Sequence, residues 1–207
     1  SRWHRTLDNP GWTDGSHVAA RGKWTENTYD QERSLTYLRY AGEDPRANAP
    51  VKRWSATLSF QTTDDSEFQN RFPDSKASNS GVLRSSSIDV ETTGVDLVLE
   101  SPVGPGSLVY GFDFYHDEVG SSGYRSNALG GPRAEVLPVA DDSDYDLFGS
   151  YCQYVFKPTD RFELTAGARY TYAEASLGRF AGGGDESRDW NDVVGSLRGI
   201  YSLNDGW

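Results

Sequence analysis

The sequence predicts an all-β chain that folds as an antiparallel meander of about seven strands. Three observations predict it: apolar and polar residues alternate along several segments, short and long connections alternate between them, and the composition suits strands. Hydrophobic residues make up only 36% of the 207 residues, whereas Gly (22), Tyr (12), Phe (9) and Trp (6) are frequent. Aromatic residues favour strands and glycine favours turns, so this mixture indicates strands and turns rather than helices.

Alternation with a period of two is clearest in segments 51–63, 107–119 and 161–175. Because side chains of a strand point alternately to its two faces, each segment is expected to have one apolar and one polar face. The apolar sets are Trp54, Ala56, Leu58 and Phe60; Leu108, Tyr110, Phe112 and Phe114; and Phe162, Leu164, Ala166, Ala168, Tyr170 and Tyr172. Less regular strands are expected at 34–40, 86–100, 144–156 and 190–203.

The connections between these segments alternate between short and long. Ser101 to Gly106 and Lys157 to Asp160 are short turns marked by Pro or Gly, and Ala41 to Pro50 belongs with them. The long connections are rich in Gly, Ser, Asp and Asn and cover 64–84, 120–143 and 178–189. Outer-membrane barrels have short periplasmic turns and long external loops, so the pattern predicts that the meander is a partial segment of a large transmembrane β-barrel.

Composition excludes several other classes of protein. Mean hydropathy is −0.68 and no stretch approaches the roughly 20 apolar residues of a membrane helix, whereas barrel strands alternate and stay polar on average. Net charge is −11 and the Lys and Arg residues are scattered, so we expect no nucleic-acid partner. Cys152 is the only cysteine, which excludes an internal disulfide. No signal peptide opens the sequence, so a location in the outer membrane requires an N-terminal segment beyond it.

Three segments resemble a known family. KPTDRFELTAGARYTY, from Lys157 to Tyr172, is similar to a signature of TonB-dependent receptor barrels, in which a turn of the form x-TDR leads into a strand of the form LTAGxRY. LVYGFDFYHDEV from Leu108 and DLFGSYCQYVF from Asp146 resemble the strands that precede this turn, in the family's order. The likeness is good over 95–207 and weak over the first 90 residues.

The resemblance implies a ligand-gated receptor of the outer membrane. Such receptors import a scarce nutrient, typically an iron-siderophore complex, haem, cobalamin or a glycan, through a barrel of about 22 strands that holds an N-terminal plug. The implied partners are the outer-membrane lipid bilayer, the plug domain, the TonB energy-transducing complex and a small nutrient ligand. The sequence contains neither a plug nor a TonB box, so 1–207 is expected to be a fragment of the barrel domain, with the plug and the barrel closure absent.

The alternation also predicts the two sides of the wall. The residues expected to face lipid are Trp54, Leu58, Phe60, Leu108, Phe112, Phe114, Leu164, Tyr170, Leu197 and Tyr201. The residues expected to face the lumen are Asp113, Tyr115, Glu163, Arg169 and Arg198. An arginine on the lipid side at the bilayer midplane costs roughly 2 to 4 kcal/mol, which favours the lumen for Arg169. General lumen polarity or contact with the plug is favoured over a dedicated ligand contact.

No pattern predicts an enzyme, a metal centre or a cofactor. His4, His17 and His116 lack ligand spacing, and the acidic run from Asp141 to Asp146 lacks the Gly turn and terminal Glu of an EF-hand loop. GGGD at 182–185 is not followed by the Lys-Ser or Lys-Thr of a phosphate-binding loop. There is no nucleophile elbow and no paired-carboxylate site. We therefore predict no catalytic residue and no metal ligand.

Two other functional classes stay open at this point. A soluble all-β carbohydrate-binding module would use exposed Trp and Tyr side chains as stacking platforms. A passive porin or an autotransporter barrel would lie in the membrane without a plug or energy coupling. Interdigitation of the apolar residues with a second sheet would favour the soluble module, and their exposure on a single sheet would favour a barrel wall.

Overall fold

The computed structural model describes residues 2–7, 23–46, 48–72, 82–126, 131–179 and 186–203. All of the regular structure in this part of the chain is β-strand. The strands are β1 (Arg2–Leu7), β2 (Lys23–Glu43), β3 (Arg53–Phe72), β4 (Val82–Val103), β5 (Gly106–Ser126), β6 (Ala134–Glu135), β7 (Ser143–Thr159), β8 (Phe162–Leu177) and β9 (Glu186–Tyr201). None of the described segments is a helix long and apolar enough to cross a membrane.

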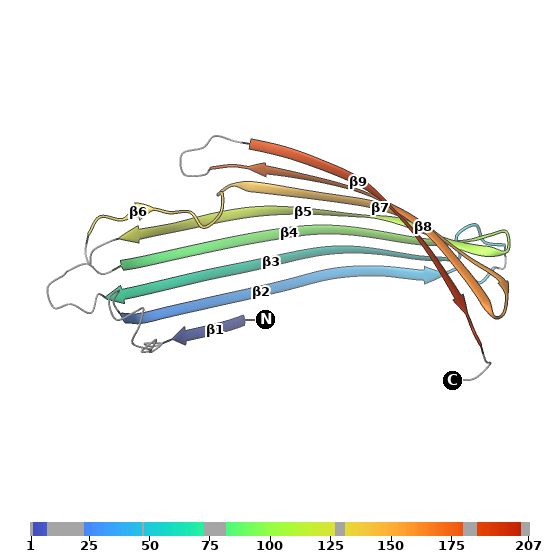
Figure 1. Ribbon diagram of the computed structural model, residues 1–207, viewed down its shortest axis with the longest axis horizontal. Coiled ribbons are helices and arrows are strands. Elements are labelled where there is room, and N and C mark those ends of the chain that lie inside the picture. Colours follow the sequence, from blue (N-terminus) through green and yellow to red (C-terminus); the bar gives the residue numbers. More distant parts are fainter. Residues whose placement is uncertain are drawn as a thin grey trace.

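The strands form one antiparallel sheet in which the long strands lie side by side (Figure 1). Its order is β1-β2-β3-β4-β5-β7-β8-β9, and β6 pairs with β5 off this path. The predicted all-β meander is confirmed, with two short strands in addition. β1 has six residues, of which two are arginines, and β6 has two residues, so neither gives a clear apolar alternation.

The long strands extend beyond their expected ends. β3 continues to Phe72, β4 begins at Val82 and β5 continues to Ser126, into segments that were expected to be loops. Both faces of these extensions are mostly polar, so the sequence has no apolar alternation there, but the main chains remain paired in register. β4 has 22 residues, or about 70 Å at about 3.3 Å per residue, whereas a barrel strand crosses a bilayer in about nine to eleven.

The three short connections lie at one end of the sheet, as expected (Figure 1). The β4–β5 turn contains Gly104 with φ 55°, a left-handed conformation that glycine adopts without a Cβ clash. The β2–β3 connection is closed by a hydrogen bond of 2.9 Å from the Asp44 N–H to the Lys52 carbonyl. The Lys52 N–H donates in turn to the Glu100 carbonyl of β4 at 2.7 Å. These bonds fix the ends of β2, β3 and β4 relative to one another.

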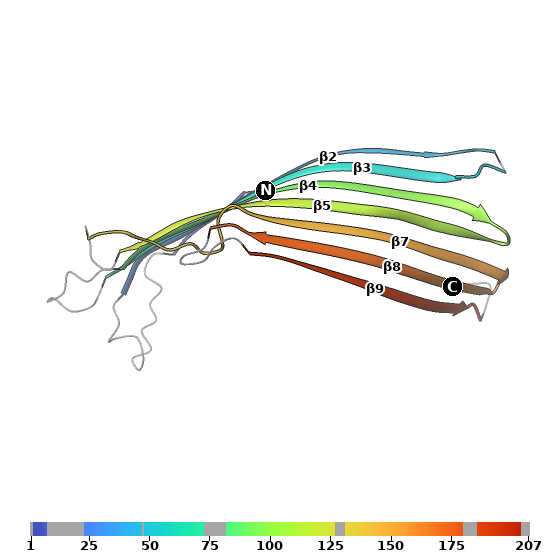
Figure 2. The same ribbon diagram turned by 90° about the horizontal axis from the view of Figure 1, so that it is seen from above.

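The described strands form a single curved layer without a second sheet (Figure 2). The buried hydrophobic residues in the described part are Ala49, Leu137 and Ala140, and all three lie in connections. Apolar side chains on the strands are open to solvent: Leu58 is 56% exposed and Leu197 is 76% exposed. A soluble sandwich buries such residues between two sheets, so this part of the chain is not a sandwich.

Both outer edges of the sheet are open. Among the described strands β9 pairs only with β8, and all of its residues are exposed. β1 covers residues Asn27 to Glu32 of β2, so residues 34–43 of β2 pair only with β3 within the described part. The free N–H and C=O groups of these edges are available to further strands.

Candidate functional site

Cross-strand pairing shows which side chains share a face, because directly paired residues of antiparallel strands point to the same side. One continuous row of paired residues crosses the sheet from β2 to β8, and it is apolar throughout. The row consists of Leu38, Leu58, Val95, Phe114, Phe148 and Tyr172. We call the side that carries this row the apolar face.

All residues expected to face lipid lie on the apolar face. They are Trp54, Leu58, Phe60, Leu108, Phe112, Phe114, Leu164, Tyr170, Leu197 and Tyr201. Leu58, Phe60, Phe114, Tyr170, Leu197 and Tyr201 are among the exposed large hydrophobic residues, and the others are half-buried. The sheet therefore presents one extended apolar surface with nothing packed against it in the described part of the chain.

The apolar face is a band of limited height. On β8 it runs from Phe162 to Tyr172, roughly 33 Å along the strand at about 3.3 Å per residue, or roughly 25 Å upright at the usual barrel tilt. At the end with the short connections, the Tyr154 hydroxyl donates to the Val103 carbonyl at 2.9 Å. At the other end the same side becomes polar with His116, whose Nδ1 lies 2.7 Å from the Asp146 carboxylate. The band thus has a polar boundary at each end.

The residues expected to face the lumen all lie on the opposite side, which we call the polar face. They are Asp113, Tyr115, Glu163, Arg169 and Arg198. The structure brings two of them together: the Arg169 guanidinium donates to both oxygens of Asp113, at 2.9 and 2.8 Å. Arg169 is on β8 and Asp113 is on β5, so the pair spans β7, which lies between them.

Gly149 of β7 makes this ion pair possible. It pairs with Asp113 on one side and with Thr171 on the other, and a Cβ at this position would overlap the Arg169 guanidinium. The side chain of Asp113 is 13% exposed and that of Arg169 is 40% exposed. The pair therefore lies flat against the sheet, with the carboxylate largely covered.

Other large side chains of the polar face also lie over glycines of the neighbouring strand. Tyr115 of β5 is paired with Gly94 of β4, and a Cβ at 94 would lie 2.7 Å from the tyrosine ring. Tyr151 of β7 is paired with Gly111 of β5, and its ring centroid is 6.0 Å from the Arg169 guanidinium carbon. Glycines in these strands thus allow large side chains to lie along the wall, a known means of stabilising glycine in sheets.

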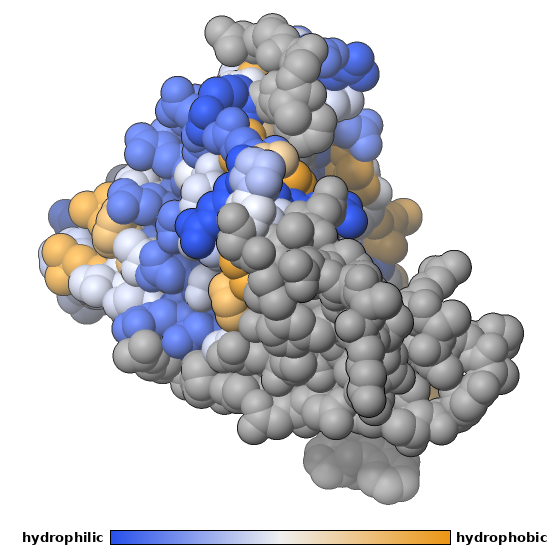
Figure 3. All heavy atoms as spheres, turned by 90° about the vertical axis from the view of Figure 1, so that its left-hand side faces the viewer, coloured by the Kyte–Doolittle hydropathy of each residue, from blue (hydrophilic) through white to orange (hydrophobic). Residues whose placement is uncertain are grey.

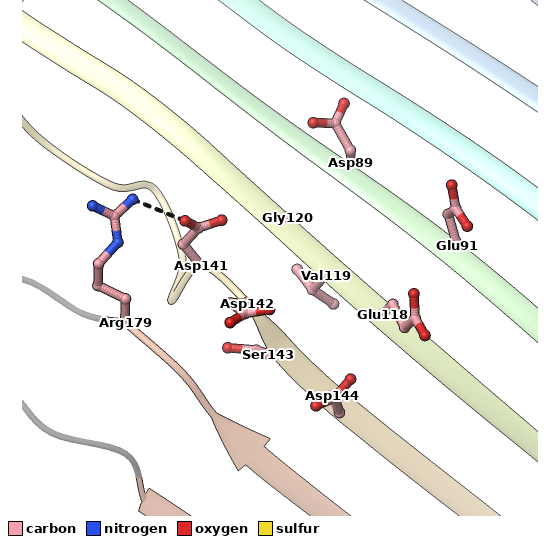
Figure 4. Close-up of a pocket in the computed structure, with 10 residues that line it drawn as sticks. All are labelled: Asp89, Glu91, Glu118, Val119, Gly120, Asp141, Asp142, Ser143, Asp144 and Arg179. Atoms are coloured by element: carbon pink, nitrogen blue, oxygen red, sulfur yellow. Dashed lines mark hydrogen bonds and ion pairs between the residues drawn. The ribbon is translucent and has the colours of Figure 1, made fainter.

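A cavity of about 710 Å³ lies where β4, β5 and β7 leave the apolar band (Figure 4). Its lining is mainly acidic and comprises Asp89, Glu91, Glu118, Val119, Gly120, Asp141, Asp142, Ser143, Asp144 and Arg179. Burial, together with a hydrogen bond to Asp64, raises the pKa of Asp89. The pKa of Asp141 is lowered, first by the Ser121 N–H and then by Arg179. Hydrophilic side chains gather on the described surface at this end of the sheet (Figure 3).

The cavity was not predicted from the sequence. The acidic run 141–146 lacks the pattern of a known metal-binding loop, and the carboxylates of Asp89, Glu91 and Glu118 come from two other strands. Within the described part, no group of three or more His, Cys, Asp or Glu side chains is arranged to hold a metal ion. His17 and the GGGD segment at 182–185 lie outside the described residues.

Comparison with known proteins assigns the family. The model of the family described as "TonB dependent receptor-like, beta-barrel" matches residues 1–207. The chain belongs to the TonB-dependent receptor β-barrel family. The resemblance carried by 157–172 is thereby confirmed, and it extends over the first 90 residues, where the sequence alone shows it weakly.

A solved structure agrees with this assignment at the level of the fold. The chain is similar to a structure named "Copper transporter OprC", with a TM-score of 0.63 and 17% sequence identity over 90% of this chain. It spans 30% of the length of that protein. Among curated proteins, no significant match is found. The matched family is a family of receptors, not of enzymes. The solved structure carries the name of a transporter.

Proposed function

We propose that this chain is part of the barrel wall of an outer-membrane receptor that imports a scarce nutrient with energy delivered by the TonB complex. The observation that carries the proposal is the exposed apolar face, which continues over all the long strands of a single sheet. A contiguous apolar surface of this kind is rare on soluble monomers and is typical of surfaces that contact lipid or a partner.

The dimensions of the apolar face support contact with a bilayer. Its upright height of roughly 25 Å matches the apolar band of about 25 Å on outer-membrane barrels. Tyr154 and Tyr110 lie at one boundary of the band. The Tyr154 hydroxyl donates to the Val103 carbonyl of β4, and the Tyr110 hydroxyl lies 3.3 Å from the Ser101 hydroxyl of β4. Aromatic side chains with an apolar body and a polar tip are favoured at the interface between lipid and water.

The open edges support a larger barrel. In hydrocarbon each unpaired N–H or C=O group costs several kcal/mol, so only closed barrels are stable among sheets. We therefore place further strands against β9 and against residues 34–43 of β2. In this proposal the chain is one segment of the barrel domain, and the remaining strands, the plug and the contact with TonB belong to other parts of the receptor.

The polar face then lines the lumen. The Arg169 and Asp113 pair would be costly in lipid but is inexpensive beside water, so the polar face cannot be the lipid side of such a wall. There its residues contact either the plug or the passing nutrient. The resemblance favours an iron-siderophore complex, haem or cobalamin as the nutrient, and the name of OprC adds copper to these candidates.

Uptake by the full-length receptor tests the proposal. Cells that carry the receptor as their only route for a candidate nutrient are compared with and without a functional TonB complex. We expect growth on limiting nutrient only when TonB is present, because the plugged barrel opens only with energy. Growth that is equal without TonB would point instead to a passive porin.

A further inference from the structure

One row of paired residues on the polar face is apolar and aromatic. It crosses all the long strands from β2 to β9 and consists of Tyr37, Ser59, Gly94, Tyr115, Leu147, Ala173 and Trp190. The Tyr115 ring lies over Gly94, so its aromatic surface continues onto β4. Ser59 is the one member of the row with a short polar side chain. We call this row the girdle.

The rows on either side of the girdle have a different character. The next row toward the short connections carries polar side chains or glycine throughout: Arg39, Thr57, Asp96, Asp113, Gly149, Thr171 and Asp192. The next row in the other direction is mixed and consists of Leu35, Gln61, Thr92, Asp117, Tyr145, Ala175 and Arg188. The girdle is therefore a distinct apolar feature of this part of the polar face.

The girdle lies at a defined height along the strands. On β8 its member Ala173 directly follows Tyr172, where the apolar band of the opposite face ends. This is the end of the band that is further from the short connections. In the barrel, the girdle therefore faces the lumen at the level where the outer surface of the wall leaves the lipid.

The aromatic members of the girdle are open to solvent. Tyr37 is 65% exposed, Trp190 is 53% exposed and Tyr115 is 36% exposed, while Leu147 and Ala173 are half-buried. An aromatic side chain buries about 150 to 250 Å² when it is covered. Continuous apolar surface that a chain leaves exposed marks a contact with a partner. The girdle is therefore a surface that a partner covers.

The width of the girdle indicates the kind of partner. The long strands lie side by side (Figure 1), and at a spacing of about 4.8 Å they make the girdle about 29 Å wide. A small-ligand pocket of at most about 1,000 Å³ is roughly 10 Å across, so a nutrient would contact only part of the row. A protein body that fills the lumen contacts all of it.

We propose that the girdle is the docking surface for the plug of the same receptor, which covers it with an apolar rim and keeps water out of the lumen at this level. The inference rests on the proposed function and names the partner of the polar face at this height. The wholly polar row beside the girdle needs no such cover, because charged side chains keep their hydration in a wet lumen.

Photo-crosslinking in the full-length receptor, without nutrient, tests which partner covers the girdle. The photoreactive residue p-benzoylphenylalanine replaces Tyr37 or Trp190 in the girdle, or Val193 as the control, which is 68% exposed and lies on the apolar face. We expect crosslinks to plug peptides from both girdle positions and none from Val193. If neither girdle position reaches the plug, the inference is overturned and the proposed function stands. Plug crosslinks from Val193 would instead contradict the two faces and with them the proposed function.

Hydrogen exchange of the full-length receptor in detergent tests whether the girdle holds the plug in place. In Trp190→Ser we expect exchange in the plug peptides that crosslink to this position to rise at least about fivefold, because the variant removes covered aromatic surface. Val194→Ser is the matched control, because Val194 is 60% exposed on the same strand and face but lies outside the girdle, paired with Arg169. We expect a change of less than about twofold for the control. Unchanged plug exchange in Trp190→Ser, or an equal rise in the control, would overturn the inference.

Discussion

Arg169 of β8 reaches across β7 to form a two-pronged ion pair with Asp113 of β5, directly above Gly149. The pair depends on the absence of a side chain at 149. We therefore expect Gly149→Val to displace the guanidinium and to destabilise the folded barrel by about 1 to 3 kcal/mol through overpacking. The measurement is the midpoint of urea unfolding of the full-length receptor in detergent.

Gly195→Val is the control for this prediction. Gly195 lies on the apolar face, and among the described residues the only atom near a Cβ there is the Gly167 carbonyl oxygen at 4.0 Å. We expect a change within about 0.5 kcal/mol for this variant. Equal destabilisation by the two valines would mean that the space above Gly149 is not what the ion pair requires.

Cys152 provides a test of the two faces by chemical labelling. It is exposed on the apolar face in the middle of β7, and Gln153 points to the polar face. In intact outer membranes we expect Cys152 to resist a charged maleimide, because the reagent does not enter hydrocarbon. The double variant Cys152→Ser/Gln153→Cys should react at least about tenfold faster. Faster labelling of the wild type than of the double variant in membranes would contradict the assignment of the two faces.

His116 predicts a pH dependence at the boundary of the band. The hydrogen bond to Asp146, with help from Glu118, raises the pKa of His116 above its usual value of 6.5. A raised pKa in the folded state means that protonated His116 stabilises the contact between β5 and β7. This contribution is complete below the usual value and is lost as the pH rises through the folded value.

The corresponding experiment compares wild type with His116→Gln. We expect exchange of the amides near 116 and 146 to be about two- to fivefold faster in the variant near pH 5.5, and equal in both proteins near pH 9. Asp146→Asn should remove most of the pH dependence, because its carboxylate is the main cause of the shift. A difference that grows toward high pH would refute this role of His116.

The sequence predicted the faces of the strands better than their ends. From Phe162 to Tyr172 every second residue is apolar or aromatic, and the observed pairing keeps that set on one side. The predicted strands are shorter than the observed ones because segments such as 64–72 are mostly polar on both faces. Continued pairing there depends on the neighbouring strands.

The sequence pattern does not predict which distant residues contact each other. Asp113 and Arg169 were each expected on the polar side, but their pairing joins positions 56 residues apart and requires the register that places Gly149 between them. The ion pair of Arg179 with Asp141 is similar, because it depends on how a connection folds back onto β5. No local alternation or motif marks either arrangement.

Two neighbouring residues on β8 test the central claim, that the apolar face contacts lipid and the polar face lines the lumen. Ala168 lies at the middle of the apolar band and Arg169 lies beside it on the polar face. The measurement is heat-modifiable gel mobility and outer-membrane yield of the full-length receptor with Ala168→Arg or Arg169→Leu. We expect Ala168→Arg to impair assembly, by roughly 2 to 4 kcal/mol, and Arg169→Leu to leave assembly nearly unchanged. Equal loss in both variants, or loss only in Arg169→Leu, would contradict the assignment of the two faces.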